Sequence, residues 1–334
     1  MPHDLSIRKD GNAEMMYVGK MPWHGLGTRL NEPPTAEEAI RAAHLDWRVV
    51  KKQLYIGDEG RPLPGQYAVV REDQWDRNED GLLGTVGQDY TPLQNVDAFG
   101  FFDPIVKSGA AFYESAGALK KGERVWVMAR LRLDFEVTQS DKIARYLLLS
   151  NTHDGTSSVQ VKFTPVRVVC KNTLNEALGR GPAIRVTHTT DMQLRLKDAA
   201  ELVLEKIQKH FDELGNRFRA MLGVSVSEPQ LHAYLKTVFP DPSPEQDERR
   251  YKRALAQVQR DRSGSSRLFS EGMGNDVPGV KGTLWAAYNG VTEFVDFHRG
   301  AYGDTKWLEN IWFGAPSGVK ARALDNALAL VQSK

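Results

Sequence analysis

The stretch of sequence that decides the fold is residues 142–181, KIARYLLLSNTHDGTSSVQVKFTPVRVVCKNTLNEALGRG. Residues 145–151 are mostly apolar and aromatic, and the His153-Asp154-Gly155-Thr156 segment that follows has the composition of a hairpin turn. Residues 158–163 then alternate apolar and polar side chains, which is typical of a strand with one buried face. The pattern therefore predicts two antiparallel strands joined by a short connection.

The second half of this stretch predicts an edge and a helix. Pro165 has no N–H to donate to a neighbouring strand, so it marks a sheet edge or a bulge before the strand resumes at 166–169. Asn172 or Thr173 can cap a short helix that ends at Gly179. These features indicate an architecture, and none of them is an obvious nucleophile or metal ligand.

The clearest strand lies upstream, at residues 124–133. Its odd positions, from Val125 to Leu133, are uniformly apolar and should face a core. Its even positions are Arg124, Trp126, Met128, Arg130 and Arg132. One face of this strand thus carries three guanidinium groups interleaved with an aromatic ring.

The second half of the chain has a helical period. From residue 191 apolar residues recur every three or four positions, which predicts an amphipathic helix of about eight turns, packed in a core or at a subunit seam. Residues 245–260 form a charged helix, interpreted as a solvated face. The fold class is α+β, an antiparallel β-sheet core with a β-β-β-α element followed by an α-helical C-terminal half. The predicted layout is an N-terminal arm at 1–30, a β-rich core at 31–190, and a helical region at 191–334 with a mobile loop at 263–282.

Composition limits the possible functions. The 334 residues have a net charge of +1, so a nucleic-acid surface would need local clustering of the 44 Lys and Arg residues. Apolar runs are too short to cross a bilayer, and the first residues lack a signal-peptide core, which predicts a cytoplasmic protein with no membrane partner. The single cysteine, Cys170, excludes an intrachain disulfide and is interpreted as a small buried hydrophobe.

The basic strand face is the candidate binding site. Guanidinium groups can follow phosphates while an aromatic ring stacks on a base, as in non-specific single-strand binders. The alternative is a second buried face on which Arg130 and Arg132 pair with carboxylates. If the strands at 124–133, 145–151 and 158–169 pair as a meander, further cations gather on one side of the sheet. The candidate DNA-binding residues are Arg124, Trp126, Arg130, Arg132, Lys120, Lys121, Lys162, Arg167 and Lys171.

Enzymatic readings have less support. His153-Asp154 resembles a catalytic or metal fragment but has no partner His at helical spacing, and a metal-dependent nuclease would need another carboxylate to converge on it. No GxxxxGK[ST] phosphate loop and no GxSxG motif occur, and Cys170 has no nearby His. The sequence therefore predicts a protein that is not an enzyme and holds no cofactor or metal.

Several motifs resemble a known family. WHGLG at 23–27, TPLQNVDAFGFFD, ESAGALKKGERVWV, NTHDGTSSVQVKFTPVRVVCKNTLNEAL and RVTHT resemble the phage/plasmid-like proteins, which are spread through prophages and plasmids and were long labelled a domain of unknown function. The match covers about residues 21–334. The architecture also looks distantly like the ring-forming single-strand annealing proteins, which include the Rad recombination mediator and phage annealases of the Red-beta kind.

The second resemblance implies a function. In that superfamily a ring of subunits holds DNA in an outer basic groove, with its bases free to pair and without ATP. The expectation is single-stranded DNA binding and ATP-independent annealing in phage or mobile-element recombination or DNA repair, by a homo-oligomeric ring. The binding roles would fall on Arg124, Trp126, Arg130, Arg132, Lys162 and Arg167. The alternative is a mobile-element host-interaction or anti-restriction protein without annealing activity, which would be indifferent to Arg130→Ala or Arg132→Ala.

Overall fold

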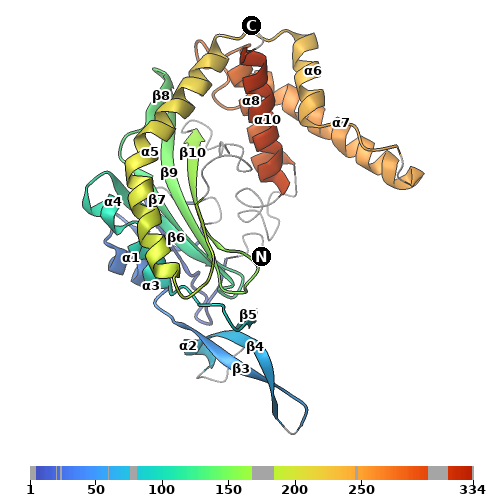
Figure 1. Cartoon of the computed structure of the whole chain (residues 1–334). Helices are drawn as coiled ribbons and strands as arrows, with labels where there is room; N and C mark the ends of the chain where they lie inside the picture. Colours follow the sequence, from blue (N-terminus) through green and yellow to red (C-terminus); the bar gives the residue numbers. More distant parts are fainter. Residues whose placement is uncertain are drawn as a thin grey trace.

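The computed structural model describes residues 5–19, 21–22, 25–58, 60–75, 81–167, 184–244, 247–299 and 315–332 (Figure 1). Trp23, His24, Cys170, Lys171 and the predicted helix at 172–179 lie outside these residues. The architecture is a mixed sheet with helices on it, followed by a helical C-terminal half, so the α+β class predicted from the sequence is confirmed.

The main sheet has eight strands in the part of the chain that the structure describes. Their order is β11-β10-β9-β7-β6-β1-β2, and β8 also pairs with β9. Neighbouring strands are antiparallel except β1 and β2, which are parallel. The strands are β1 (Met15–Val18), β2 (Thr28–Leu30), β6 (Ala111–Leu119), β7 (Arg124–Leu131), β8 (Phe135–Thr138), β9 (Asp141–Thr152), β10 (Val159–Arg167) and β11 (Ile184–Val186). The first 30 residues, expected as an arm, thus supply two strands of this sheet.

The hairpin predicted at residues 145–163 is confirmed as β9 and β10. Asp154 shapes its turn, because its carboxylate accepts hydrogen bonds from the backbone N–H (2.9 Å) and the hydroxyl (2.6 Å) of Thr156. Pro165 lies beyond Val161, the last β10 residue that pairs with β11, so among the described residues it lies at the predicted edge position. Since β7 pairs with β9 and β9 with β10, the predicted meander is also confirmed.

One face of the main sheet carries the core. Val125, Val127 and Ala129 are completely buried on it, as the alternation in β7 predicts. Leu133 is an exception at 70% exposure, because β7 ends at Leu131. The helices that contribute to this core include α1 (Ala36–Ala42), α3 (Asn95–Gly100), α4 (Asp103–Lys107) and the long α5 (Met192–Leu222), which crosses the sheet in Figure 1. The same core continues into the helices of the C-terminal half.

Local signals explain two of these helices. Thr35 and Glu38 cap the start of α1 reciprocally, each side chain accepting a hydrogen bond from the other residue's backbone N–H. On α5 the apolar stripe is buried inside this chain, with Phe211 and Phe218 fully enclosed. The stripe is therefore part of the core of this chain. Its apolar side chains, where the structure describes them, are covered by the same chain and not left open for a second subunit.

A second sheet extends from the body. Its strands are β3 (Val49–Ile56), β4 (Arg61–Arg71) and β5 (Leu82–Gly87), in that order in the sheet. The short helix α2 (Glu72–Trp75) lies between β4 and β5 in the chain. The far end of the β3–β4 hairpin projects below the main sheet in Figure 1 and leaves Tyr55 and Ile56 more than half exposed. Its near end packs into the core through Val49 and Val69.

The C-terminal half is helical. It contains α6 (Glu228–Val238), α7 (Glu248–Glu271), α8 (Leu284–Glu293), a π-helical turn (Phe294–His298) and α10 (Ala315–Gln332). The indole N–H of Trp285 on α8 donates to Asp141 at the start of β9, at 2.8 Å, and joins this half to the main sheet. No helix in the described part of the chain is long and apolar enough to span a membrane.

The loop predicted at 263–282 is wrong for its first nine residues and right for 272–282, which connect α7 to α8. Residues 263–271 continue α7, and the turn after them holds Asn275 completely buried, with its amide donating to Leu268 and Ala286. The small residues serve close packing: a Cβ at Gly264 would lie 2.1 Å from the Phe294 ring, and one at Gly290 would lie 2.9 Å from the Ser265 carbonyl. Glycine here allows α7 and α8 to approach each other, so its abundance does not indicate mobility.

Candidate nucleic-acid interface

The polar face of β7 is largely covered. The N-terminal segment lies over it, and Leu5, Ala13 and Met15 form a small second core with Trp126. Trp126 itself is only 1% exposed. The structure therefore does not present the indole for stacking on a base, which was the central feature of the candidate site.

Arg130, on β7, and Arg132, just after it, lie in different surroundings. Arg130 pairs with Asp134 at 3.1 Å and with Glu114 at 3.5 Å, and Glu114 also accepts the Tyr146 hydroxyl at 2.9 Å. Burial nevertheless raises the pKa of Glu114, against the lowering effect of Tyr146 and Arg130. Arg132 is exposed, with its guanidinium 5.7 Å from the centre of the Phe112 ring. The alternative of a structural, carboxylate-paired face thus describes Arg130.

The cation on β10 is also enclosed. Lys162 is only 7% exposed, and burial lowers its pKa to about 8, with Arg124 and Arg185 adding repulsion. Arg124 donates to the Ser150 hydroxyl at 3.3 Å. These three cations are brought near one another, as the meander predicted, but Lys162 is too buried to meet a phosphate in solvent. The Arg167 side chain and Lys171 lie outside the described residues.

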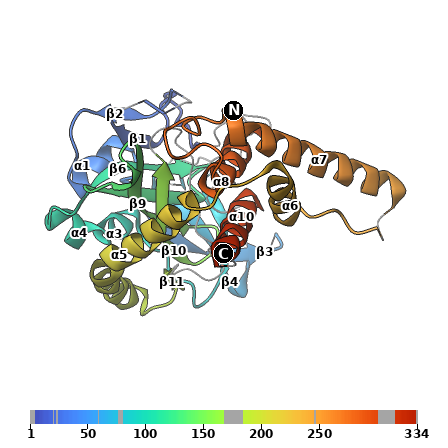
Figure 2. The same cartoon turned by 90° about the horizontal axis from the view of Figure 1, so that it is seen from above.

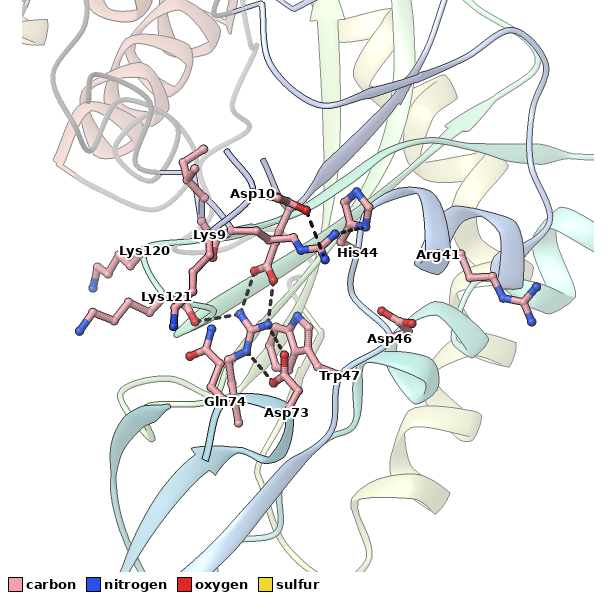
Figure 3. Close-up of a pocket in the computed structure, with 15 residues that line it drawn as sticks. Lys9, Asp10, Arg41, His44, Asp46, Trp47, Asp73, Gln74, Lys120 and Lys121 are labelled. Carbon is pink, nitrogen blue, oxygen red and sulfur yellow. Dashed lines mark hydrogen bonds and ion pairs between the residues drawn. The ribbon is translucent and has the colours of Figure 1, made fainter. Parts of the chain in front are cut away.

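The remaining predicted residues are on the β6–β7 turn. Lys120 has a left-handed backbone (φ 58°) and pairs with Glu123 at 2.8 Å. Lys121 is exposed, and its carbonyl accepts a hydrogen bond from Arg71 at 3.2 Å. Both lysines line a pocket of about 670 Å³ (Figure 3). Its other lining residues are Ser6, Ile7, Arg8, Lys9, Asp10, Glu14, Arg41, His44, Asp46, Trp47, Arg71, Asp73 and Gln74.

Arg71 forms the base of this pocket. It is 2% exposed, makes a two-pronged contact with Glu14 at 2.8 and 2.9 Å, and also contacts Asp73 at 3.1 Å. Its guanidinium lies 4.1 Å from the centre of the Trp47 ring. Burial is the largest single effect on Arg71 and lowers its pKa, but the hydrogen bonds and charges of Glu14 and Asp73 together outweigh it, so the pKa is raised. Through its contacts with Glu14, the residue just before β1, the Arg71 side chain links the main sheet to the second sheet.

The rim of the pocket collects cations from three distant segments. Arg8 and Lys9 come from the N-terminal segment, Arg41 from α1, and Lys120 and Lys121 from the β6–β7 turn. Lys9, Lys120 and Lys121 lie along one side of the pocket and Arg41 lies on the other (Figure 3). We call these five residues the rim cluster.

Carboxylates partly balance the rim cluster. Arg8 pairs with Asp10 at 3.4 Å and also contacts Nδ1 of His44 at 2.7 Å, while Arg41 pairs with Glu37. The lining itself holds six Lys or Arg residues against four Asp or Glu residues, and two carboxylates outside it, Glu37 and Glu123, pair with Arg41 and Lys120. Sequence reasoning missed Arg8, Lys9 and Arg41 because they follow no strand or helix period. The only signal was a short basic pair at residues 8–9.

His153 is a buried residue of the protein interior. It is fully buried, lies 3.1 Å from the Asn95 side-chain oxygen, and packs edge-on against Trp47. Asp154 is occupied by Thr156 in the turn. The described ranges contain no group of three or more His, Cys, Asp or Glu residues that could hold a metal ion. A third ligand for a nuclease centre at His153-Asp154 is thus absent from the described part of the chain.

Comparison with known proteins gives one match. A family model described as a domain of unknown function, DUF932, matches residues 82–327. No curated protein and no solved structure matches the chain. Of the pocket-lining residues, only Lys120 and Lys121 fall within the matched segment. Because that segment covers well over half of the sequence, the chain belongs to the DUF932 family.

Proposed function

We propose that this protein binds single-stranded DNA and anneals complementary strands without ATP, acting as a homo-oligomer in phage or mobile-element recombination. The observation that carries the proposal is the rim cluster, in which Arg8, Lys9, Arg41, Lys120 and Lys121 line one pocket from three parts of the chain. The contact proposed here lies beside the β6–β7 turn, before β7 begins, rather than along the polar face of β7. Lys120 and Lys121 were among the residues predicted from the sequence.

Convergent cations fit a phosphate backbone. Each Lys or Arg that contacts a phosphate releases a condensed counterion, and this release provides most of the affinity in non-specific binding. Such contacts need no sequence readout, which is what a protein that pairs any two complementary strands requires. A phosphate loop is missing from the sequence, which favours annealing that needs no nucleotide. The oligomeric part of the proposal comes from the resemblance to ring-forming annealing proteins.

The test is binding of a fluorescent oligothymidylate by anisotropy, over a salt series from about 50 to about 200 mM. We expect binding by the wild type that weakens with salt. The variant Lys9→Gln/Lys120→Gln/Lys121→Gln should reduce the slope of log affinity against log salt by about 2, because each phosphate contact on a single strand contributes about 0.7. The same variant should slow annealing of two complementary oligonucleotides in a buffer without nucleotide.

The matched control is Lys107→Gln/Lys197→Gln/Lys236→Gln. It removes the same charge from α4, α5 and α6, which contribute no residue to the pocket. If the control and the rim variant bind alike, the rim cluster is not the contact surface. If the wild type binds no DNA even at low salt, the DNA-binding function is wrong and the host-interaction alternative takes its place.

A further inference from the structure

Helix α7 (Glu248–Glu271) extends away from the body of the protein. Its C-terminal part packs on α8 and buries Asp261, Ser265 and Leu268. The first half, residues 248–260, contains no buried residue and projects into open space in two perpendicular views (Figures 1 and 2). A rigid helix is thus held by one end, with most of the other end accessible.

The projecting half is strongly basic. Residues 248–260 hold five Lys or Arg residues and one carboxylate, Glu248, in a protein whose net charge is only +1. Arg249, Arg253 and Arg260 fall within about 40° of one another around the helix, at 100° per residue. They form a stripe about 16 Å long at 1.5 Å per residue. We call these three residues the α7 stripe.

The opposite side of the same half is apolar. Tyr251, Leu255 and Val258 lie there and are partly buried, and Val258 packs against the core. Since this side faces back toward the protein, the α7 stripe faces outward. The helix is amphipathic, with the apolar side anchored and the basic side presented.

The charges on the stripe are largely uncompensated. Arg249 and Arg253 make no ion pair with any residue that the structure describes, whereas Lys252 pairs with Glu248 at 2.6 Å. Arg260 donates to Gln257 at 2.7 Å and has no carboxylate partner in the described ranges. Repulsion between Arg249 and Arg253, one turn apart, destabilises the helix rather than supporting it.

The position of the charges also opposes helix stability. Arg249 and Arg250 lie in the first turn of α7, where the helix dipole is positive and carboxylates are favoured. Asp247 at the N-cap and Glu248 in the first turn offset part of this effect, since Asp247 accepts the backbone N–H of Arg250 and Glu248 pairs with Lys252. Arg249 and Arg253 have no such carboxylate partner among the described residues, and a polyanion would relieve the repulsion between them.

We propose that the α7 stripe is a second phosphate-binding element, which holds the nucleic-acid backbone separately from the rim cluster. This inference rests on the proposed DNA-binding function and names a further surface for it. Its partner is recognised by charge alone: an extended chain of phosphodiesters lying along Arg249, Arg253 and Arg260.

The experiment uses the full chain and the variant Arg249→Gln/Arg253→Gln/Arg260→Gln, since glutamine keeps helix propensity. We expect the affinity for oligothymidylate at low salt to fall about tenfold and the salt slope to fall by about 2. The charge-preserving variant Arg249→Lys/Arg253→Lys/Arg260→Lys should keep both near wild type. Circular dichroism of each variant checks that α7 remains folded.

Arg29→Gln/Arg195→Gln/Arg217→Gln is the matched control, with three exposed arginines removed from β2 and α5. If the stripe variant binds like this control while the rim variant loses binding, the inference is wrong and the proposed function stands. If the wild type binds no DNA, both are wrong. Binding of polyglutamate that depends on the stripe, without binding of DNA, would overturn the inference in favour of an acidic protein surface.

Discussion

His153 shows how a residue's chemistry depends on its surroundings. In the sequence it stands in a polar turn beside Asp154, which suggests catalysis or metal binding. In the structure it is fully enclosed between Asn95 and Trp47. Burial, with smaller contributions from His188 and Arg71, lowers the pKa of His153 to about 3, so the ring is neutral at physiological pH.

This burial predicts a pH dependence of stability. The unfolded chain takes up a proton at His153 near its ordinary pKa of about 6.5, whereas the folded protein does not until about pH 3. The contribution to stability is therefore complete above about pH 6.5 and is lost as the pH falls toward 3, by an amount on the order of 5 kcal/mol. We expect His153→Gln to show a smaller loss of unfolding free energy between neutral and acidic pH.

Urea denaturation at several pH values measures this difference. His232→Gln is the matched control, because His232 is exposed on α6. The control should keep the wild-type pH dependence. Equal acid sensitivity in the wild type and in His153→Gln would show that His153 is not buried in its neutral form.

At the scale of elements, the crossing of α7 and α8 depends on glycine. A side chain at Gly264 would collide with the ring of Phe294, itself 7% exposed. The Gly- and Ser-rich composition of this region suggested a loop, yet the structure shows a helix pressed closely against its neighbour. Composition alone gives the same signal for a flexible loop and for a tight helix crossing.

Two Gly→Ala substitutions should therefore change the free energy of unfolding in opposite directions. In a helix interior, replacing glycine by alanine usually raises the stability of the protein by up to about 1 kcal/mol. Gly318→Ala on α10 should follow this rule, because nothing lies within 4 Å of its added Cβ. Gly264→Ala should instead destabilise by about 1–3 kcal/mol, since the Phe294 ring must move. Thermal and urea unfolding compare the two, and stabilisation by Gly264→Ala would contradict the close crossing.

At the scale of the whole molecule, contacts between distant segments close the structure. Leu5 bridges to Leu119 and packs with Trp126, so the N-terminal segment seals the second face of the main sheet. Glu14 and Arg71 join the main sheet to the second one, and Asp141 and Trp285 join the main sheet to the helical half. The state of the β7 face is thus set by residues more than 100 positions away.

Removing residues 1–9 should uncover Trp126. We expect a larger fraction of the tryptophan fluorescence to be quenched by acrylamide in the truncated protein than in the full chain, because Trp126 loses Leu5 from its cover. The same truncation made together with Trp126→Phe should show no such increase relative to Trp126→Phe alone. If truncation leaves the quenching of the wild type unchanged, the N-terminal segment does not cover this face.

The sequence alone was enough for most elements. The alternation in β7, the hairpin of β9 and β10 and the stripe of α5 were all predicted within a few residues. Each of these rests on interactions between residues close in sequence, namely backbone hydrogen bonding, turn conformation and periodic burial. The predicted DNA-binding site required the polar face of β7 to be exposed to solvent. The periodicity of a strand does not indicate which other segment packs against that face.

Three features were decided only by the tertiary structure. Trp126 is covered by the N-terminal segment, Arg130 finds its partners in Glu114 and Asp134, and the rim cluster assembles from residues 8 to 121. The sequence by itself determined that the chain is an α+β protein and which side of each strand and helix is apolar, because those preferences are local. The exposure of each side chain and the pairing of charges were decided by the tertiary structure, because they depend on which distant segment packs against each surface.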